Sequence, residues 1–162
     1  MTTKTVRVNI AFIFLKSAGV VLVVTAIAKL ISSFGTARIL QNIDPVLGIP
    51  FRDELWIVGT IELTVSLICF FGKSYRLQSI IVTWLATSIL VYRIGLVWID
   101  YRKPCSCLGN LTDALHIPPQ IADTAMKIIL AYLLIGSYST LFWLWLDKRK
   151  TTRLTRLTET IV

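Results

Sequence analysis

Four long apolar blocks constrain this sequence more than any other feature. They cover residues 8–31, 55–71, 77–99 and 121–146. An apolar stretch of about 18 or more residues predicts a membrane-spanning helix, because a rise of about 1.5 Å per residue carries it across a hydrocarbon core about 30 Å thick. Only 16% of the 162 residues are charged, which is too little polar surface for a soluble domain of this size. The sequence therefore predicts an all-α integral membrane four-helix bundle, with one membrane domain over 8–146 and a basic tail over 147–162.

The basic residues predict the orientation of the bundle. They gather before the first block, between the second and third, and after the fourth: Lys4, Arg7, Lys73, Arg76, Lys148, Arg149, Lys150, Arg153 and Arg156. Positive charge marks the cytoplasmic side of a membrane protein, so both termini are expected in the cytoplasm and the connections 32–54 and 100–120 on the other side. Because the net charge of +8 is distributed in this way, the expected partner is the lipid bilayer and not a nucleic acid.

Cys105 and Cys107 form the most distinctive motif. They lie one residue apart in the connection 100–120, on the expected non-cytoplasmic side, where disulfides form and persist. A disulfide between them would close almost no loop and would be strained, so it would stabilise little and would be labile. Arg102 and Lys103 lie just upstream and would favour a reactive thiolate. These features favour thiol–disulfide chemistry, with the two cysteines as the catalytic residues.

Two other interpretations of the pair stay open. The two thiols can remain permanently bridged as a clip within the loop, or they can bind a metal ion together with His116, the only histidine. Cys69 is a different case, because it lies near the cytoplasmic end of the second block. It is expected to be a small buried apolar residue.

Each apolar block contains one ionisable residue toward its non-cytoplasmic end: Lys29, Glu62, Arg93 and Lys127. At about 1.5 Å per residue, all four fall within the outer third of the membrane, as one layer beneath the cysteines. Charges inside a membrane are costly and usually mark functional sites. Glu62 is expected to point inward and to pair with one or two of the cations. The excess positive charge could stabilise a thiolate or hold a quinone carbonyl near Glu62, Arg93 and Lys127.

Three charged side chains in or beside the blocks, Lys29 among them, are expected to reach water. Lys29 lies so close to the end of its block that its ammonium group is expected to extend to the membrane surface. Lys16 is expected to do the same on the cytoplasmic side. Asp123 stands at the edge of the fourth block and is expected to be solvated.

Taken in their order along the chain, the charged residues of the blocks and the cysteine motif resemble those of the methylamine-utilisation MauE family, within the DoxX-like superfamily of bacterial membrane proteins. The resemblance covers roughly residues 15–140. It rests on Gly19 and Lys29 in the first block, Glu62 in the second, and the PCSCLG segment 104–109 after the third. It implies a multi-pass protein of the bacterial inner membrane with the cysteine pair facing the periplasm, in a family associated with maturation of methylamine dehydrogenase. Ser106 stands where the family often has glycine.

Two functional hypotheses follow. In the first, the chain is a thiol–disulfide oxidoreductase that exchanges with periplasmic thiol or disulfide client proteins, and a quinone is the candidate electron carrier. In the second, it is a non-catalytic membrane scaffold or assembly factor whose cysteine pair stays bridged. The redox hypothesis predicts that the state of Cys105 and Cys107 changes with respiration, whereas the scaffold hypothesis predicts that it does not.

Overall fold

The computed structural model describes residues 2–35, 38–100 and 119–159. Its helices are α1 (Thr2–Ser33), the short 3-10 helix η1 (Arg38–Gln41), α2 (Phe51–Phe71), α3 (Tyr75–Trp98) and α5 (Pro119–Glu159). Among these described segments, four stretches are long and apolar enough to cross a membrane: Ile10–Ser33, Phe51–Phe71, Tyr75–Trp98 and Asp123–Leu146. The predicted all-α four-helix membrane bundle is therefore confirmed, and the protein is a multi-pass membrane protein.

Three helix ends differ from those that hydropathy predicts. The first helix begins at Thr2, six residues before its apolar block. The second helix begins at Phe51, four residues before the apolar block, directly after Pro50. The last helix does not end with the fourth block but continues to Glu159 through most of the predicted basic tail. Hydropathy marks only the part of a helix that contacts lipid, so it cannot locate ends that extend into polar surroundings. The early start of α2 has a structural consequence, because it places Glu54 on the helix.

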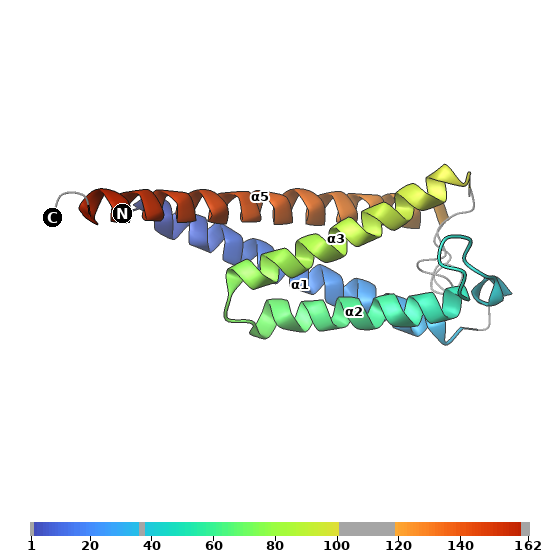
Figure 1. Ribbon diagram of the computed structural model, residues 1–162. Coiled ribbons are helices and arrows are strands. Elements are labelled where there is room, and N and C mark those ends of the chain that lie inside the picture. The colour runs from blue at the N-terminus through green and yellow to red at the C-terminus, as the bar shows by residue number, and fades with distance from the viewer. Residues whose placement is uncertain (1, 36–37, 101–118, 160–162) are drawn as a thin grey trace.

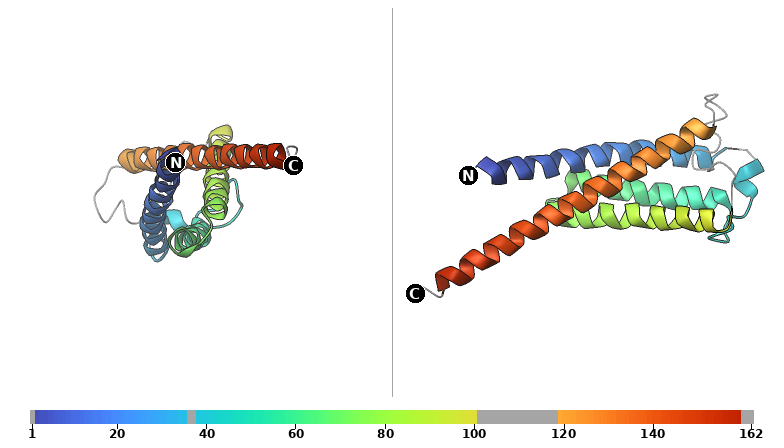
Figure 2. Two further views of the ribbon diagram at one scale, coloured as in Figure 1. Left: turned by 90° about the vertical axis from the view of Figure 1, so that its left-hand side faces the viewer. Right: turned by 90° about the horizontal axis from the view of Figure 1, so that it is seen from above.

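The chain runs back and forth so that the helix ends fall into two groups (Figure 1). Both termini and the turn from α2 to α3 lie at one end of the bundle. The other end, termed the loop end, is where α1 and α3 finish and where α2 and α5 begin. The most extensive contacts join α1 to α2 and α3 to α5, and α5 crosses the other helices obliquely (Figure 2).

Small and aliphatic side chains form a core where the four helices meet. Its fully buried members include Leu15, Ala18, Leu22, Val65, Cys69, Val82, Ala86 and Leu133. Cys69 is 1% exposed, which confirms its predicted role as a packing residue. Most large side chains on the outer faces are apolar, including Ile13, Val24, Ile128 and Ile135. Apolar residues both inside and outside are expected of a helix bundle in lipid.

At the C-terminal end of α2, side chains of α1 and α3 donate hydrogen bonds to the last backbone carbonyl groups of the helix. The Lys16 ammonium of α1 donates to the Phe70 carbonyl oxygen at 2.6 Å and to that of Cys69 at 3.3 Å. The Gln78 amide of α3 donates to the carbonyl oxygens of Ile68 and Gly72. The last carbonyl groups of a helix have no partner within the helix, so these contacts supply one. Lys16 is half-buried and its ammonium group lies at this end of α2, so its extension to the membrane surface stays a prediction.

Candidate functional site

A buried ion pair joins α1 to α2. The Lys29 ammonium lies 2.7 Å from both carboxylate oxygens of Glu62, and the Thr25 hydroxyl donates to Glu62 Oε2 at 3.0 Å. Thr25 and Lys29 are four residues apart, so they share one face of α1. Lys29 is only 5% exposed and Glu62 only 2%. The inward position predicted for Glu62 is confirmed, but the expectation that Lys29 reaches the membrane surface is wrong, because the carboxylate partner holds it inside.

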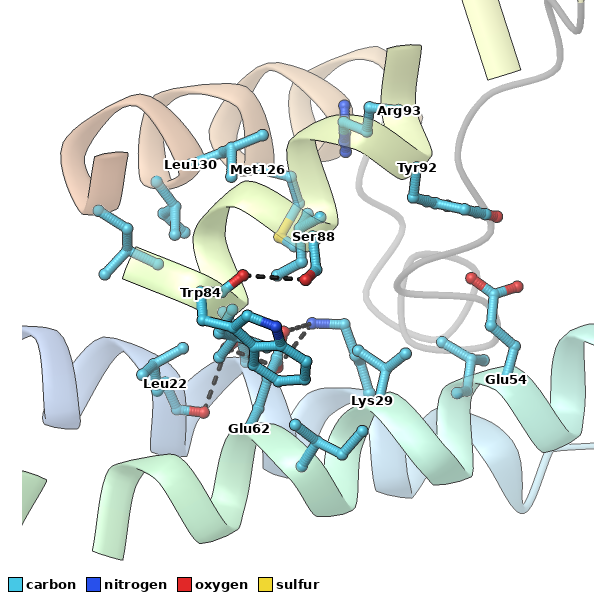
Figure 3. A pocket seen from close by; sticks show the side chains of 18 of the residues that line it. Leu22, Lys29, Glu54, Glu62, Trp84, Ser88, Tyr92, Arg93, Met126 and Leu130 are labelled. Carbon is cyan, nitrogen blue, oxygen red and sulfur yellow. Dashed lines mark hydrogen bonds and ion pairs between the residues drawn. The ribbon is translucent and has the colours of Figure 1, made fainter. Parts of the chain in front are cut away.

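This ion pair borders a cavity of about 200 Å³ between the four helices (Figure 3). One face of each helix contributes to the wall, at the spacing of three, four or seven residues that a helical face requires. α1 contributes Leu22, Thr25 and Lys29, and α2 contributes Phe51, Glu54, Leu55, Val58, Ile61 and Glu62. α3 contributes Trp84, Leu85, Ser88, Ile89, Tyr92 and Arg93, and α5 contributes Met126, Ile129, Leu130 and Leu133. Leu47 of the connection completes the wall. The cavity is thus mostly apolar and contains a few charged groups near the loop end.

A second polar cluster lies at the loop end of the cavity. The Tyr92 hydroxyl donates to Asp44 Oδ2, and Asp44 Oδ1 accepts from the backbone N–H groups of Val46 and Leu47 at 2.6 and 2.7 Å. Asp44 is fully buried, so the carboxylate fixes residues 44–47 of the connection against α3. Glu54 faces both Tyr92 and Asp44. Its Oε2 atom is buried and has no hydrogen-bond partner among the described residues.

A third group links α3 to α5. Arg93 Nη1 lies 2.9 Å from Asp123 Oδ1, and Lys127 Nζ lies 2.7 Å from Asp123 Oδ2. Asp123 was expected to be solvated, but its carboxylate instead bridges the two cations. The Arg93 side chain is 15% exposed, and its Nη2 atom is buried with no partner in the described part of the chain.

Three of the four residues of the predicted charged layer lie at the cavity, whereas the fourth does not. Lys29, Glu62 and Arg93 all line the cavity. Lys127 does not line it, and its side chain is 65% exposed. Sequence spacing gives the depth of a residue along a helix but not the direction in which its side chain points, and Lys127 lies on a different face of α5 from Met126 and Leu130.

Sequence reasoning missed Glu54, Tyr92 and Asp44. Both acids fall within the predicted connection 32–54, outside the apolar blocks in which intramembrane charges were sought. The spacing of Glu54, Val58 and Glu62 would have placed Glu54 on the inward face of α2, had the helix been extended back to Phe51. A tyrosine carries no charge, so Tyr92 gives no signal in a search for ionisable residues.

The remaining predicted residues, Cys105, Cys107 and His116, lie outside the described residues. In the described ranges, no group of three or more His, Cys, Asp or Glu residues is arranged to hold a metal ion. No protein family, curated protein or solved structure matches the chain. The chemistry of the site is therefore derived from its own residues.

Proposed function

We propose that this chain is a thiol–disulfide redox component of the bacterial inner membrane that supports maturation of periplasmic proteins. Cys105 and Cys107 exchange with client proteins on the periplasmic side, both termini lie in the cytoplasm, and a carrier dissolved in the bilayer exchanges electrons with the pair. The proposal also includes the relationship to MauE-like proteins that the PCSCLG segment 104–109 indicates.

One observation supports this function above the others: the charged part of the cavity lies toward the loop end of the bundle, where α3 ends and α5 begins (Figure 1). Arg93 is five residues from the end of α3, and Met126 is seven residues from the start of α5. The segment 101–118, which carries both cysteines, connects these two helix ends. A carrier held in the cavity would therefore occupy the part of the membrane domain that is nearest to the cysteine segment along the chain.

The chemistry of the proposed cycle is balanced. A client thiolate attacks the Cys105–Cys107 disulfide and forms a mixed disulfide, and the second client thiol then releases the reduced pair. The client gains one disulfide, and the pair gains two electrons and two protons. Return to the disulfide passes two electrons and two protons to the membrane carrier. Cys69 takes no part, because it is buried in the core far along α2 from the cavity.

The scaffold hypothesis does not account for the charged groups that line the cavity. A buried ion pair contributes little net stability, because the cost of removing two charges from water offsets their attraction. Well-packed apolar residues would hold α1 and α2 together equally well. Charged groups around an open cavity are better explained by binding of a ligand.

Trapping the two thiols in living cells tests this function. Cells are treated with a thiol-alkylating reagent before and after respiration is inhibited, and the mass added to the protein is measured. The bridged fraction of Cys105 and Cys107 is expected to fall severalfold when the carrier can no longer be reoxidised, whereas Cys69 is unmodified in both samples. A pair that stays bridged in every condition would favour the scaffold.

A further inference from the structure

Two residues that line the same cavity each carry one buried polar atom with no hydrogen-bond partner among the described residues. One is Arg93 Nη2, a hydrogen-bond donor, and the other is Glu54 Oε2. A buried polar group without a partner costs free energy, so nearly all such groups in proteins are paired with protein, water or a ligand. The other charged groups of the wall are satisfied, because Glu62 binds Lys29 and Thr25. These two atoms are therefore the ones that would gain a partner from a ligand, and each side chain would turn toward the ligand to reach it, because neither atom is exposed to the cavity.

The rest of the wall specifies a ligand that is otherwise apolar. Apart from the polar residues already named, the cavity is lined mainly by Leu, Ile, Val and Met side chains. Its volume of about 200 Å³ is below the range of about 300–1,000 Å³ typical of pockets that enclose a whole drug-sized molecule. A single ring fits this space better than a phospholipid does. A tail on that ring would extend past Trp84 and Ser88, which line the cavity and are also exposed on α3.

We propose that the cavity binds a quinone and its quinol, with Arg93 Nη2 donating to one ring oxygen and the Glu54 carboxyl group hydrogen-bonded to the other. The proposal rests on the proposed function, since it names the electron carrier and the residues that hold it. A carboxyl group suits both redox states with one geometry. Protonated, it donates to a carbonyl oxygen, and ionised, it accepts from a hydroxyl group. Glu54 can therefore pass a proton to or from the bound ring as two electrons move.

The surroundings of Glu54 explain why this acid and not its neighbours has the role. The charged or titratable groups that face it in the described structure are Asp44 of the connection, Tyr92 of α3 and Lys29 of α1. Asp44 already accepts three hydrogen bonds, and Lys29 is held by Glu62. The assignment also changes the sequence-based expectation, which placed a quinone beside Glu62, Arg93 and Lys127. Of those three residues, only Arg93 both lines the cavity and carries an unpaired polar atom in the described structure.

Quenching of tryptophan emission tests the proposal on the purified full-length protein in detergent. The probe is decylubiquinone, a quinone with a short tail. Because Trp84 lines the cavity, saturable quenching is expected that is largely lost in Trp84→Phe. Arg93→Lys keeps a cation beside Asp123 but lacks the second nitrogen, so the affinity should fall about tenfold. Glu54→Leu should weaken binding to a similar extent, and Glu54→Gln, whose amide can still donate, should largely restore it.

The matched control is Lys127→Gln, which removes a cation of the same region that does not line the cavity, and it should leave the affinity unchanged. Quenching that never saturates, or that is the same in Arg93→Lys and wild type, would overturn the proposal. A Cys105→Ser/Cys107→Ser variant separates this proposal from the function, because it should bind decylubiquinone normally. Binding in this variant, with cysteines that never change state in cells, would leave the binding site standing and the redox function refuted. Cysteines that change state in cells, in a protein that does not bind decylubiquinone, would refute only the binding site.

Discussion

Replacing Glu62 with alanine is expected to lower the free energy of unfolding by about 3–5 kcal/mol, a larger loss than for any other residue that lines the cavity. The reason is that the Lys29 ammonium group would lose the two oxygens that lie 2.7 Å from it. Lys29 is 5% exposed, so water cannot replace the lost partner. The measurement is the temperature at which buried Cys69 becomes reactive to a fluorogenic thiol dye, in a Cys105→Ser/Cys107→Ser background.

Two further variants separate the loss of charge pairing from the loss of packing. Lys29→Met combined with Glu62→Leu removes both charges, keeps the volume, and should regain most of the stability. Thr25 remains satisfied in this variant, because its hydroxyl also donates to the Leu22 carbonyl oxygen. Lys127→Ala, at an exposed ion pair, should cost less than about 1 kcal/mol. A double variant no more stable than Glu62→Ala would contradict the buried ion pair as the cause.

Asp44→Ala is expected to have the second largest effect on stability, about 2–3 kcal/mol. The substitution leaves three donors without their acceptor: the backbone N–H groups of Val46 and Leu47 and the hydroxyl of Tyr92. It should also free residues 44–47 from α3. Hydrogen exchange of the Leu47 amide, followed by mass spectrometry, reports this release and should become at least about tenfold faster.

Asp44→Asn is the matched control for this prediction. The asparagine oxygen can still accept from the two backbone N–H groups, and its amide can donate to the Tyr92 hydroxyl oxygen. It should therefore retain most of the stability and of the amide protection. Equal exchange of Leu47 in wild type and Asp44→Ala would show that the carboxylate does not anchor the connection.

The sequence predicts most of the fold, because the membrane imposes a simple requirement on it. A helix must present about 20 apolar residues to lipid, and the blocks over 8–31 and 77–99 match the apolar spans Ile10–Ser33 and Tyr75–Trp98 to within a few residues at each end. The ends of α2 and α5 could not be predicted in this way. α2 begins directly after Pro50, and α5 continues through a polar stretch to Glu159. Hydropathy detects neither, because it does not distinguish a polar helix from a polar loop.

The site was predicted only in part, because spacing along a helix does not show which groups will meet. Lys29 and Glu62 were both identified, yet their pairing depends on how α1 packs on α2. Glu54 and Asp44 both fall in the predicted connection 32–54, although they converge on Tyr92 from opposite sides of Pro50. Arg93 was identified as an intramembrane cation, but its one paired and one unpaired nitrogen become visible only when Asp123 is placed beside it.

The redox state of Cys105 and Cys107 in cells that express Arg93→Lys tests the central claim most directly, namely that electrons leave the cysteine pair through the cavity. It is measured by thiol alkylation during normal respiration, beside wild type and Lys127→Gln at equal protein levels. The pair is predicted to accumulate in the reduced form in Arg93→Lys and to remain as oxidised as wild type in Lys127→Gln. A pair that is equally oxidised in all three strains would contradict the claim.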